Sequence, residues 1–369
     1  MSVLKQYRRD LHRIPELGFE LPLTLEYVKN HLDTLDGELI EPAPSSLCIY
    51  FDAGKDSTIA FRADMDGLPV SEAVESDFTS THPGQMHACG HDGHMSMLLA
   101  LCDFVSENLT ELPHNVLAIF QPAEETTGGA EPICQSGVLK DYAVDAVFGL
   151  HMWPGYPAGT IISRPGELMA RSSEITVDIL GKSVHIAKAA TGKNAMRAAV
   201  LLLDLIHDAV AQIPPNVHRL LGFGLLQAGT VRNALAGSAH IEGTMRAFSD
   251  PVFEQLREIL LDSAARVEEA TGCAVSVDIA AGYPPVINDP ELYADVSGQV
   301  QVPIVEIEEP QMTGEDFSFY QQQVPGIFFF VGTGRDQALH SPTFDMDEEA
   351  LTGGYNLLKS LLFLELPNR

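Results

Sequence analysis

The stretch MHACGHDGH, residues 86–94, places one cysteine, three histidines and an aspartate close together in the chain. Thiolate and imidazole are ligands that zinc and similar transition metals prefer. Cys89 and His91 lie two positions apart, so a continuous helix would point them about 200° apart around its axis. They can therefore converge on one ion only from a loop.

An apolar helix is expected directly after this loop, over residues 94–103, with Asp92 as a candidate N-cap. The loop would then present Cys89 and His91 at a helix N-terminus, where the positive end of the helix dipole favours a thiolate. A solvated loop with incidental histidines is the alternative. The concentration of ligand types in so short a stretch favours a metal site.

Composition limits the class of protein. The chain has 369 residues, of which 45% are hydrophobic, enough material for two domains. The net charge of -29 creates a field that repels nucleic acid and anionic membranes, so neither is an expected partner. No apolar run approaches the ~20 residues of a membrane span, and residues 1–16 form an amphipathic pattern unlike a signal peptide. Five scattered cysteines predict a reduced, cytoplasmic protein: Cys48, Cys89, Cys102, Cys134 and Cys273.

Helical periodicity alternates along the chain with short β-rich runs, which predicts an α/β architecture. Residues 116–120 and 327–331 are apolar throughout, as expected of central strands that are covered on both faces. We expect a catalytic domain with a mixed, mainly parallel sheet flanked by helices. The expected helices are residues 3–14, 23–35, 93–107, 194–212, 251–270, 290–299 and 347–365.

The middle of the chain follows a different order. From residue 171 to 279, the pattern predicts strand, helix, strand, strand, helix, strand. This βαββαβ order is ferredoxin-like and predicts a small antiparallel sheet with two helices on one face. We therefore predict a discontinuous catalytic domain, residues 1–170 and 283–369, and an inserted α+β domain, residues 171–282.

Polar segments follow four of the expected strands, at the position where α/β sheets place functional groups. They are residues 61–69, 121–125, 151–153 and 339–342. Glu124 and Glu125 are adjacent, so on extended backbone their side chains point to opposite sides. One can bind a metal ion while the other acts as a base toward a water that the ion has acidified to a pKa near ~7. An ordinary exposed loop is the alternative interpretation.

Taken singly, His151 or His340 would more often be an ordinary core residue than a ligand. Together with the other candidates they provide more ligands than one closed tetrahedral site can use. Such a number suits two ions that share a bridging ligand. Their chemistry allows Zn²⁺, Mn²⁺, Co²⁺ or Ni²⁺. The candidate ligands are Cys89, His91, Glu125, His151 and His340.

These motifs resemble the metallopeptidase family M20, in its amidohydrolase branch of aminoacylases, auxin-conjugate hydrolases and N-acetyldiaminopimelate deacetylases. Residues 121–130 and 155–160 are most similar to the members that deacetylate N-acetyldiaminopimelate in lysine biosynthesis. The matching segments span nearly the whole chain: residues 8–16 (RRDLHRIPE), 62–64 (RAD), 87–94, 121–125 (QPAEE), 181–185 and 313–317 (TGEDF).

The resemblance implies roles for the residues of the metal site. The five candidate ligands would hold two divalent ions, with Cys89 in the bridging position. Glu124 would act as general base and then as general acid. Asp64 would lie behind the site and orient a ligand histidine, as outer carboxylates of metal sites do.

The resemblance also implies that the inserted domain serves as a lid and as the contact of a homodimer. His185 would stabilise the oxyanion, from the same subunit or from its partner, which suits an imidazole donor. Asn233 and Arg246 would bind the substrate, and the forked guanidinium of Arg246 suits a carboxylate.

One segment departs from the family pattern. Many relatives have two glycines directly before the lid histidine and a second histidine after it, whereas here Ser183-Val184 precede His185 and Lys188-Ala-Ala follows. Ser183 and Val184 restrict the backbone, which affects the expected lid geometry and substrate choice. Lys188 and Lys193 would meet an acidic substrate or are simple surface lysines.

We therefore expect an amidohydrolase that deacylates an N-acyl amino acid, converting N-acetyl-L,L-diaminopimelate to acetate and L,L-diaminopimelate. A broad aminoacylase, a hippurate-type hydrolase or a dipeptidase would use the same chemistry on another substrate. A metal-stabilised binding protein without catalysis is the alternative of another class, and the presence of Glu124 argues against it.

Overall fold

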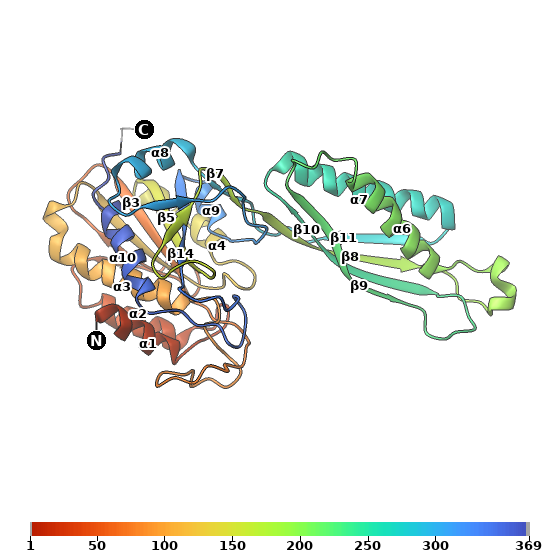
Figure 1. The fold of residues 1–369 in the computed structure, drawn as a ribbon, viewed down its shortest axis with the longest axis horizontal. Helices are drawn as coiled ribbons and strands as arrows, with labels where there is room; N and C mark the ends of the chain where they lie inside the picture. The colour runs from red at the N-terminus through yellow and green to blue at the C-terminus, as the bar shows by residue number, and fades with distance from the viewer. Residues whose placement is uncertain (1, 367–369) are drawn as a thin grey trace. The chain divides into compact units, whose positions relative to one another are not determined.

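The computed structural model describes residues 2–366 and divides the chain into two compact units (Figure 1). The first unit contains Met1–Leu168, Val286–Pro310 and Asp316–Arg369. The second contains Met169–Pro285 and also Gln311–Glu315, a short segment that lies outside the insertion expected from the sequence. Each unit has its own hydrophobic core.

The first unit is built on an eight-stranded sheet in the order β1-β2-β4-β3-β5-β14-β6-β13. Four of its seven strand pairings are parallel, so the mixed, mainly parallel α/β sheet predicted from the sequence is confirmed. Two further strands, β7 (Gly166–Met169) and β12 (Val286–Asn288), pair separately. The strands of the large sheet are β1 (Glu38–Ile40), β2 (Leu47–Phe51), β3 (Thr58–Asp64), β4 (Asn115–Gln121), β5 (Val144–Trp153), β6 (Ile161–Ser163), β13 (Ile304–Glu306) and β14 (Gly326–Gly332).

Helices flank this sheet (Figure 1), and α3 contacts α1, α10 and strand β3. Every residue of α3 from His91 to Cys102 is buried, because the helix is enclosed by these neighbours. Among residues 2–366, no helix is both long and apolar enough to cross a membrane. The helices of this unit are α1 (Val3–His12), α2 (Pro22–Leu32), α3 (His91–Asn108), the 3₁₀ turn η1 (Leu109–Glu111), α4 (Ala130–Gln135), α5 (Val138–Asp141), α8 (Pro290–Gln299), α9 (Ser318–Gln321) and α10 (Ala350–Leu361).

The central strands place the carboxyl ends of four segments at one edge of the sheet. Strands β3, β4 and β14 are buried at every position, as predicted for the two apolar runs in the sequence. β4 pairs in parallel with β3, β3 with β5, and β5 with β14. Their carboxyl ends therefore meet, which is where functional groups gather in sheets of this kind.

The prediction that Asp92 caps helix α3 is wrong. The helix begins at His91, and Gly90 occupies the N-cap position with φ +88°, a left-handed conformation that glycine adopts without strain. A Cβ added at Gly90 would lie 2.9 Å from Met152 Cβ, so the close packing against β5 also requires glycine. Asp92 lies in the first turn and is fully buried.

The second unit has the βαββαβ order, with an antiparallel sheet in the order β11-β8-β10-β9. Buried and exposed side chains alternate along β8, and Ile175, Val177 and Ile179 join the core that includes residues of α6 and α7. One face of the sheet is thus covered by helices. The elements are β8 (Arg171–Leu180), the 3₁₀ segment η2 (Ile186–Thr191), α6 (Ala195–Val210), β9 (Arg219–Ala228), β10 (Ser238–Ala247), α7 (Asp250–Thr271) and β11 (Ala274–Ile279).

We predict that Gly149→Ala in β5 lowers the free energy of unfolding by about 1–3 kcal/mol, the usual cost of overpacking a core. An added Cβ would lie 2.8 Å from the rings of Phe317 and Phe328, which are both fully buried. Gly298→Ala in α8 is the matched control, because it is exposed and an added Cβ meets nothing within 4 Å. The control should leave stability unchanged or raise it slightly. Urea denaturation measures both; equal midpoints for the two variants would contradict the packing argument.

Candidate metal centre

The structure brings the five predicted ligands together in the first unit. Cys89 lies in the loop before α3, and His91 is the first residue of that helix. Glu125 follows β4, His151 lies in β5, and His340 lies in the loop after β14. Four separate segments of the chain therefore supply ligand atoms to one place.

The ligand atoms form two overlapping groups of three. Cys89 Sγ lies 3.4 Å from His151 Nε2 and 3.3 Å from His340 Nε2. In the first group, the ligand atoms of Cys89, His91 and His151 all lie within 4.8 Å of one another. In the second, those of Cys89, Glu125 and His340 do the same. Cys89 is common to both groups, so its sulfur has the position that a bridging ligand requires.

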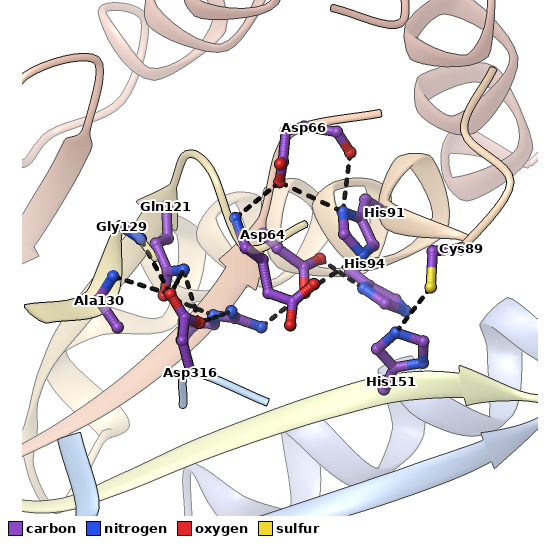
Figure 2. Close-up of polar contacts among 12 residues, drawn as sticks. Asp64, Asp66, Cys89, His91, His94, Gln121, Gly129, Ala130, His151 and Asp316 are labelled. Atoms are coloured by element: carbon purple, nitrogen blue, oxygen red, sulfur yellow. Dashed lines mark hydrogen bonds and ion pairs between the residues drawn. The ribbon is translucent and has the colours of Figure 1, made fainter. Parts of the chain in front are cut away.

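Hydrogen bonds fix the ring orientation of two candidate ligand histidines. His91 Nδ1 donates to the Asp66 carbonyl oxygen at 2.8 Å (Figure 2). His151 Nδ1 donates to the Met152 carbonyl oxygen at 2.7 Å. When the ring is neutral, each of these bonds leaves Nε2 as the acceptor, which is the form that binds a cation. Among the described residues, His91 Nε2 is buried without a hydrogen-bond partner. The buried Glu125 Oε1 lies 3.2 Å from His340 Nε2 and 3.8 Å from His91 Nε2. A divalent ion fits this donor set, because it would give His91 Nε2 a partner and neutralise Glu125.

The electrostatics of the cluster agree with a cation. Burial, with His94 nearby, lowers the pKa of His151 to about 3, so its imidazole is neutral. Burial disfavours the charged form of His91, but Asp64, Asp66 and Glu125 outweigh it and raise its pKa to about 10. These carboxylates would equally stabilise a metal ion at Nε2. Burial and the charges of Glu125 and Glu124 raise the pKa of the Cys89 thiol, and a bound cation would reverse that effect.

Asp66 joins three parts of the site, although no role for it was predicted. Its carboxylate accepts hydrogen bonds from the backbone N–H groups of Glu124 and Glu125, each at 3.1 Å. Its carbonyl oxygen accepts from His91. Asp66 is fully buried, so it fixes the loop after β4 against the loop after β3. An acidic residue two positions after the mostly apolar strand β3 was the available sequence signal.

Two residues of the site have left-handed backbone conformations that are unusual for residues other than glycine. Ala123 has φ +58° and His340 has φ +63°. Such conformations cost of order 1–3 kcal/mol and persist where the surrounding structure holds them. Ala123 directly precedes the two glutamates, and His340 is itself a candidate ligand. The backbone turns at both positions thus direct ligand side chains toward the cluster.

Asp64 contacts a different histidine from the one expected. Its Oδ1 accepts from His94 Nδ1 at 2.6 Å, whereas its Oδ2 lies 3.7 Å from Nε2 of the candidate ligand His91. His94 Nε2 in turn accepts from the Met152 N–H at 2.8 Å. Asp64 therefore supports the end of β5, next to His151, through His94. His94 follows His91 by almost one helical turn, and both side chains are buried.

A second group of buried polar residues lies beside Asp64, on the side away from His91 and His94 (Figure 2). Arg62 donates to Asp64 at 2.6 Å and to Asp316 at 2.8 Å. Asp316 also accepts from the side chain of Gln121 and from the backbone N–H groups of Gly129 and Ala130. All of these interactions are buried, so Arg62 is neutralised by two carboxylates that each have further donors.

The three predicted substrate-binding residues lie in the second unit. The backbone N–H of Ile186 donates to the Asn233 carbonyl oxygen at 2.9 Å, so His185 and Asn233 lie in adjacent segments. His185 is exposed, and its Nδ1 accepts from the Ala187 N–H at 3.2 Å. Arg246 lies in β10 and donates to the Met312 carbonyl oxygen. Their predicted roles toward the metal centre stay predictions.

Comparison with known proteins places this geometry in a family. The family described as Peptidase family M20/M25/M40 matches residues 60–363. An N-acetyldiaminopimelate deacetylase of Shouchella clausii is 36% identical over 358 residues, covering 95% of each chain. The solved structure of a Bacillus subtilis protein described as a dinuclear metal binding peptidase from M20 family has a TM-score of 0.85 and 30% identity, covering 97% of this chain and 96% of that one.

A putative aminohydrolase from methicillin resistant Staphylococcus aureus has a TM-score of 0.91 and 27% identity, covering 98% of this chain and 96% of that one. These relatives and the clustered ligand atoms together support divalent metal binding by this chain. They also support hydrolysis of an amide bond. The chain belongs to peptidase family M20/M25/M40 and is a metal-dependent amide-bond hydrolase.

Proposed function

We propose that the protein deacylates N-acyl amino acids and that N-acetyl-L,L-diaminopimelate is its preferred substrate. One observation carries the proposal. Glu124 is buried beside the ligand cluster, and one of its carboxylate oxygens lies within 4.8 Å of the ligand atoms of His91 and Glu125. A carboxylate in that position can exchange protons with a reacting group in the site.

Two divalent ions, each Zn²⁺, Mn²⁺, Co²⁺ or Ni²⁺, would share Cys89. The first would take His91 and His151, and the second would take Glu125 and His340. When bound, such an ion lowers the pKa of water and polarises an amide carbonyl. The softness of Cys89 and the imidazoles is compatible with all four metals.

Glu124 would take the proton of the attacking water and later deliver it to the leaving amine. The backbone N–H of Glu124 is fixed by Asp66, so the carboxylate has a defined direction of approach. A base held in place in this way contributes roughly 10²–10⁴ to the rate. Asp64, supported by Arg62, would keep the end of β5 in position through His94.

The second unit would supply the groups that recognise the substrate. His185 would donate to the oxyanion, and Asn233 and Arg246 would bind the polar and carboxylate groups. We also propose that this unit acts as a lid and forms the contact of a homodimer. The cytoplasmic location predicted from the cysteines remains a prediction.

The charge of one segment supports a substrate with more than one carboxylate. The sequence from Asp178 to Asp204 contains no acidic residue in between, although the chain has a net charge of -29. Its basic residues are Lys182, Lys188, Lys193 and Arg197. The Lys193 ammonium lies near Gly272, where helix α7 ends. Its positive charge there interacts favourably with the negative end of the helix dipole. Lys188 follows His185 on an exposed turn, where it is available to an anionic substrate.

A second candidate function has its own observation. Val184 replaces a glycine of the family pattern, and its side chain lies over Gly192, where an added Cβ would be 2.5 Å from Val184 Cγ2. The Val184 side chain thus fills the inside of the turn that carries His185. A changed turn favours a substrate other than N-acetyldiaminopimelate, as in a broad aminoacylase, a hippurate-type hydrolase or a dipeptidase.

We predict that Glu124→Gln leaves the metal content unchanged and lowers kcat by roughly 10² or more, because the amide cannot accept the proton. Metal analysis and steady-state kinetics on the same preparation measure the two quantities. Glu131→Gln is the matched control, since Glu131 is an exposed residue of α4. Full activity in Glu124→Gln would exclude this residue as the base.

We predict that Cys89→Ala loses both ions, whereas His151→Ala retains the ion of the other group. The reason is that Cys89 Sγ belongs to both ligand groups and His151 to one. Metal-to-protein ratios after dialysis measure the difference. Cys48→Ala is the control, because Cys48 is a buried cysteine of β2 outside the ligand groups. Equal metal loss in Cys89→Ala and His151→Ala would argue against a shared sulfur.

We predict the highest kcat/KM for N-acetyl-L,L-diaminopimelate in a panel with N-acetyl-L-methionine, hippurate and dipeptides, by roughly tenfold or more. Chelation should abolish all activities, and addition of Zn²⁺, Mn²⁺, Co²⁺ or Ni²⁺ should restore them. A better substrate elsewhere in the panel would assign the second candidate function. Metal-loaded, folded protein that hydrolyses no member of the panel would leave the binding-protein alternative.

A further inference from the structure

The N-terminal segment Arg8–Glu16 matches a family motif but has no part in the proposed chemistry. It begins within helix α1, which packs against α3. Arg8 and His12 lie one helical turn apart and are only 2% and 4% exposed. Long polar side chains are rarely buried to this extent unless they are paired. Their partners therefore indicate what the segment does.

Both side chains bind Asp92, the residue that follows the candidate ligand His91. Arg8 Nε donates to Asp92 Oδ2 at 3.1 Å, and His12 Nδ1 donates to the same oxygen at 2.8 Å. His12 Nε2 also lies 3.2 Å from Glu72 Oε1. Burial opposes the charged form of His12, but Asp92 and Glu72 outweigh it and raise its pKa to about 9. Two cationic donors thus hold the first turn of α3.

The same segment holds the other side of His91. The Glu16 carbonyl oxygen accepts from the Gly67 N–H at 2.7 Å. Gly67 follows Asp66, whose carbonyl oxygen accepts from His91 Nδ1. The Glu16 carboxylate accepts from the backbone N–H groups of Leu23 and Thr24, which fixes the segment at the start of α2. Both backbone segments that orient the His91 ring are therefore tied to the N-terminal segment.

We infer that Arg8 and His12 are positioning residues of the metal centre, which hold the ligand His91 through Asp92. This inference rests on the proposed metal site. A ligand that is already oriented loses less conformational freedom when it binds an ion, so the ion binds more tightly. Removal of partners one shell outside the ligands commonly weakens metal affinity by roughly 10–100-fold.

The adjacent Arg9 provides a matched control. It lies on the same helix, and its Nε and Nη2 donate to Glu348 at 2.8 and 2.6 Å. Arg8 Nη1 also lies 3.6 Å from Glu348, so the two arginines differ in the bond from Arg8 to Asp92. Arg8→Gln and Arg9→Gln therefore remove the same charge from neighbouring positions, and only the first removes a contact to Asp92. Arg8→Lys tests rescue by a cation, and His12→Gln leaves the Arg8–Asp92 pair intact.

The measurement is the dissociation constant of Co²⁺, obtained by competition with a chelator at a temperature where circular dichroism shows each metal-free variant to be folded. We expect about tenfold or greater weakening for Arg8→Gln and His12→Gln, partial recovery in Arg8→Lys, and a wild-type constant for Arg9→Gln. The Co²⁺ absorption spectrum, which reports ligand geometry, should change in His12→Gln and not in Arg9→Gln.

Wild-type affinity and spectrum in His12→Gln would overturn the inference, whether or not Arg8→Gln folds. Equal weakening in Arg8→Gln and Arg9→Gln would also overturn it, because the effect would then be one of net charge. Failure of the wild-type protein to bind Co²⁺ would contradict the proposed metal site instead. The two proposals are therefore separated by one set of measurements.

Discussion

Arg62 lies fully buried between the carboxylates of Asp64 and Asp316, and the site depends on this arrangement of charges. A buried charge that lacks a partner costs several kcal/mol, so each acidic group here must have donors. Asp316 accepts from four residues, through the side chains of Arg62 and Gln121 and two backbone N–H groups. Asp64 shares Arg62 and adds His94. The buried carboxylates at the carboxyl edge of the sheet therefore have donors within the protein itself.

Further buried hydrogen bonds connect this group of charges to the candidate ligands. His94 holds the backbone of Met152, next to His151, and Asp66 holds both His91 and the backbone of the glutamate pair. The buried ligand atoms His91 Nε2 and Glu125 Oε1 lie 3.8 Å apart, and a cation bound by both would neutralise the excess negative charge. The carboxylates that are fully paired stabilise the fold around the site. The carboxylates that are only partly neutralised would attract a cation.

The sequence predicted the α/β fold and the loop with Cys89 because both depend on local patterns. Apolar runs identified the central strands, and the spacing of Cys89 and His91 required a loop. The partners of the buried carboxylates could not be predicted in this way, since Arg62 and Asp316 are separated by 254 positions. The N-cap at Gly90 was missed because its cause is contact with Met152, far along the chain. Short strands such as β6 and β13 form through pairing and carry little pattern of their own.

The two units differ in how freely their functional residues can change. Asp64, Asp66 and Asp316 are fully buried, and loss of any one would leave a cation or several N–H groups without a partner. His185 and Lys188 instead lie on an exposed turn of the second unit, where a substitution removes few contacts. On the proposed function, the residues that support hydrolysis therefore cannot be substituted without destabilising the fold. The residues that select the substrate can be substituted. Ser183 and Val184 lie in the same turn as His185, so on the proposed function their difference from the expected family pattern would affect the choice of acyl amino acid and not the ligand cluster.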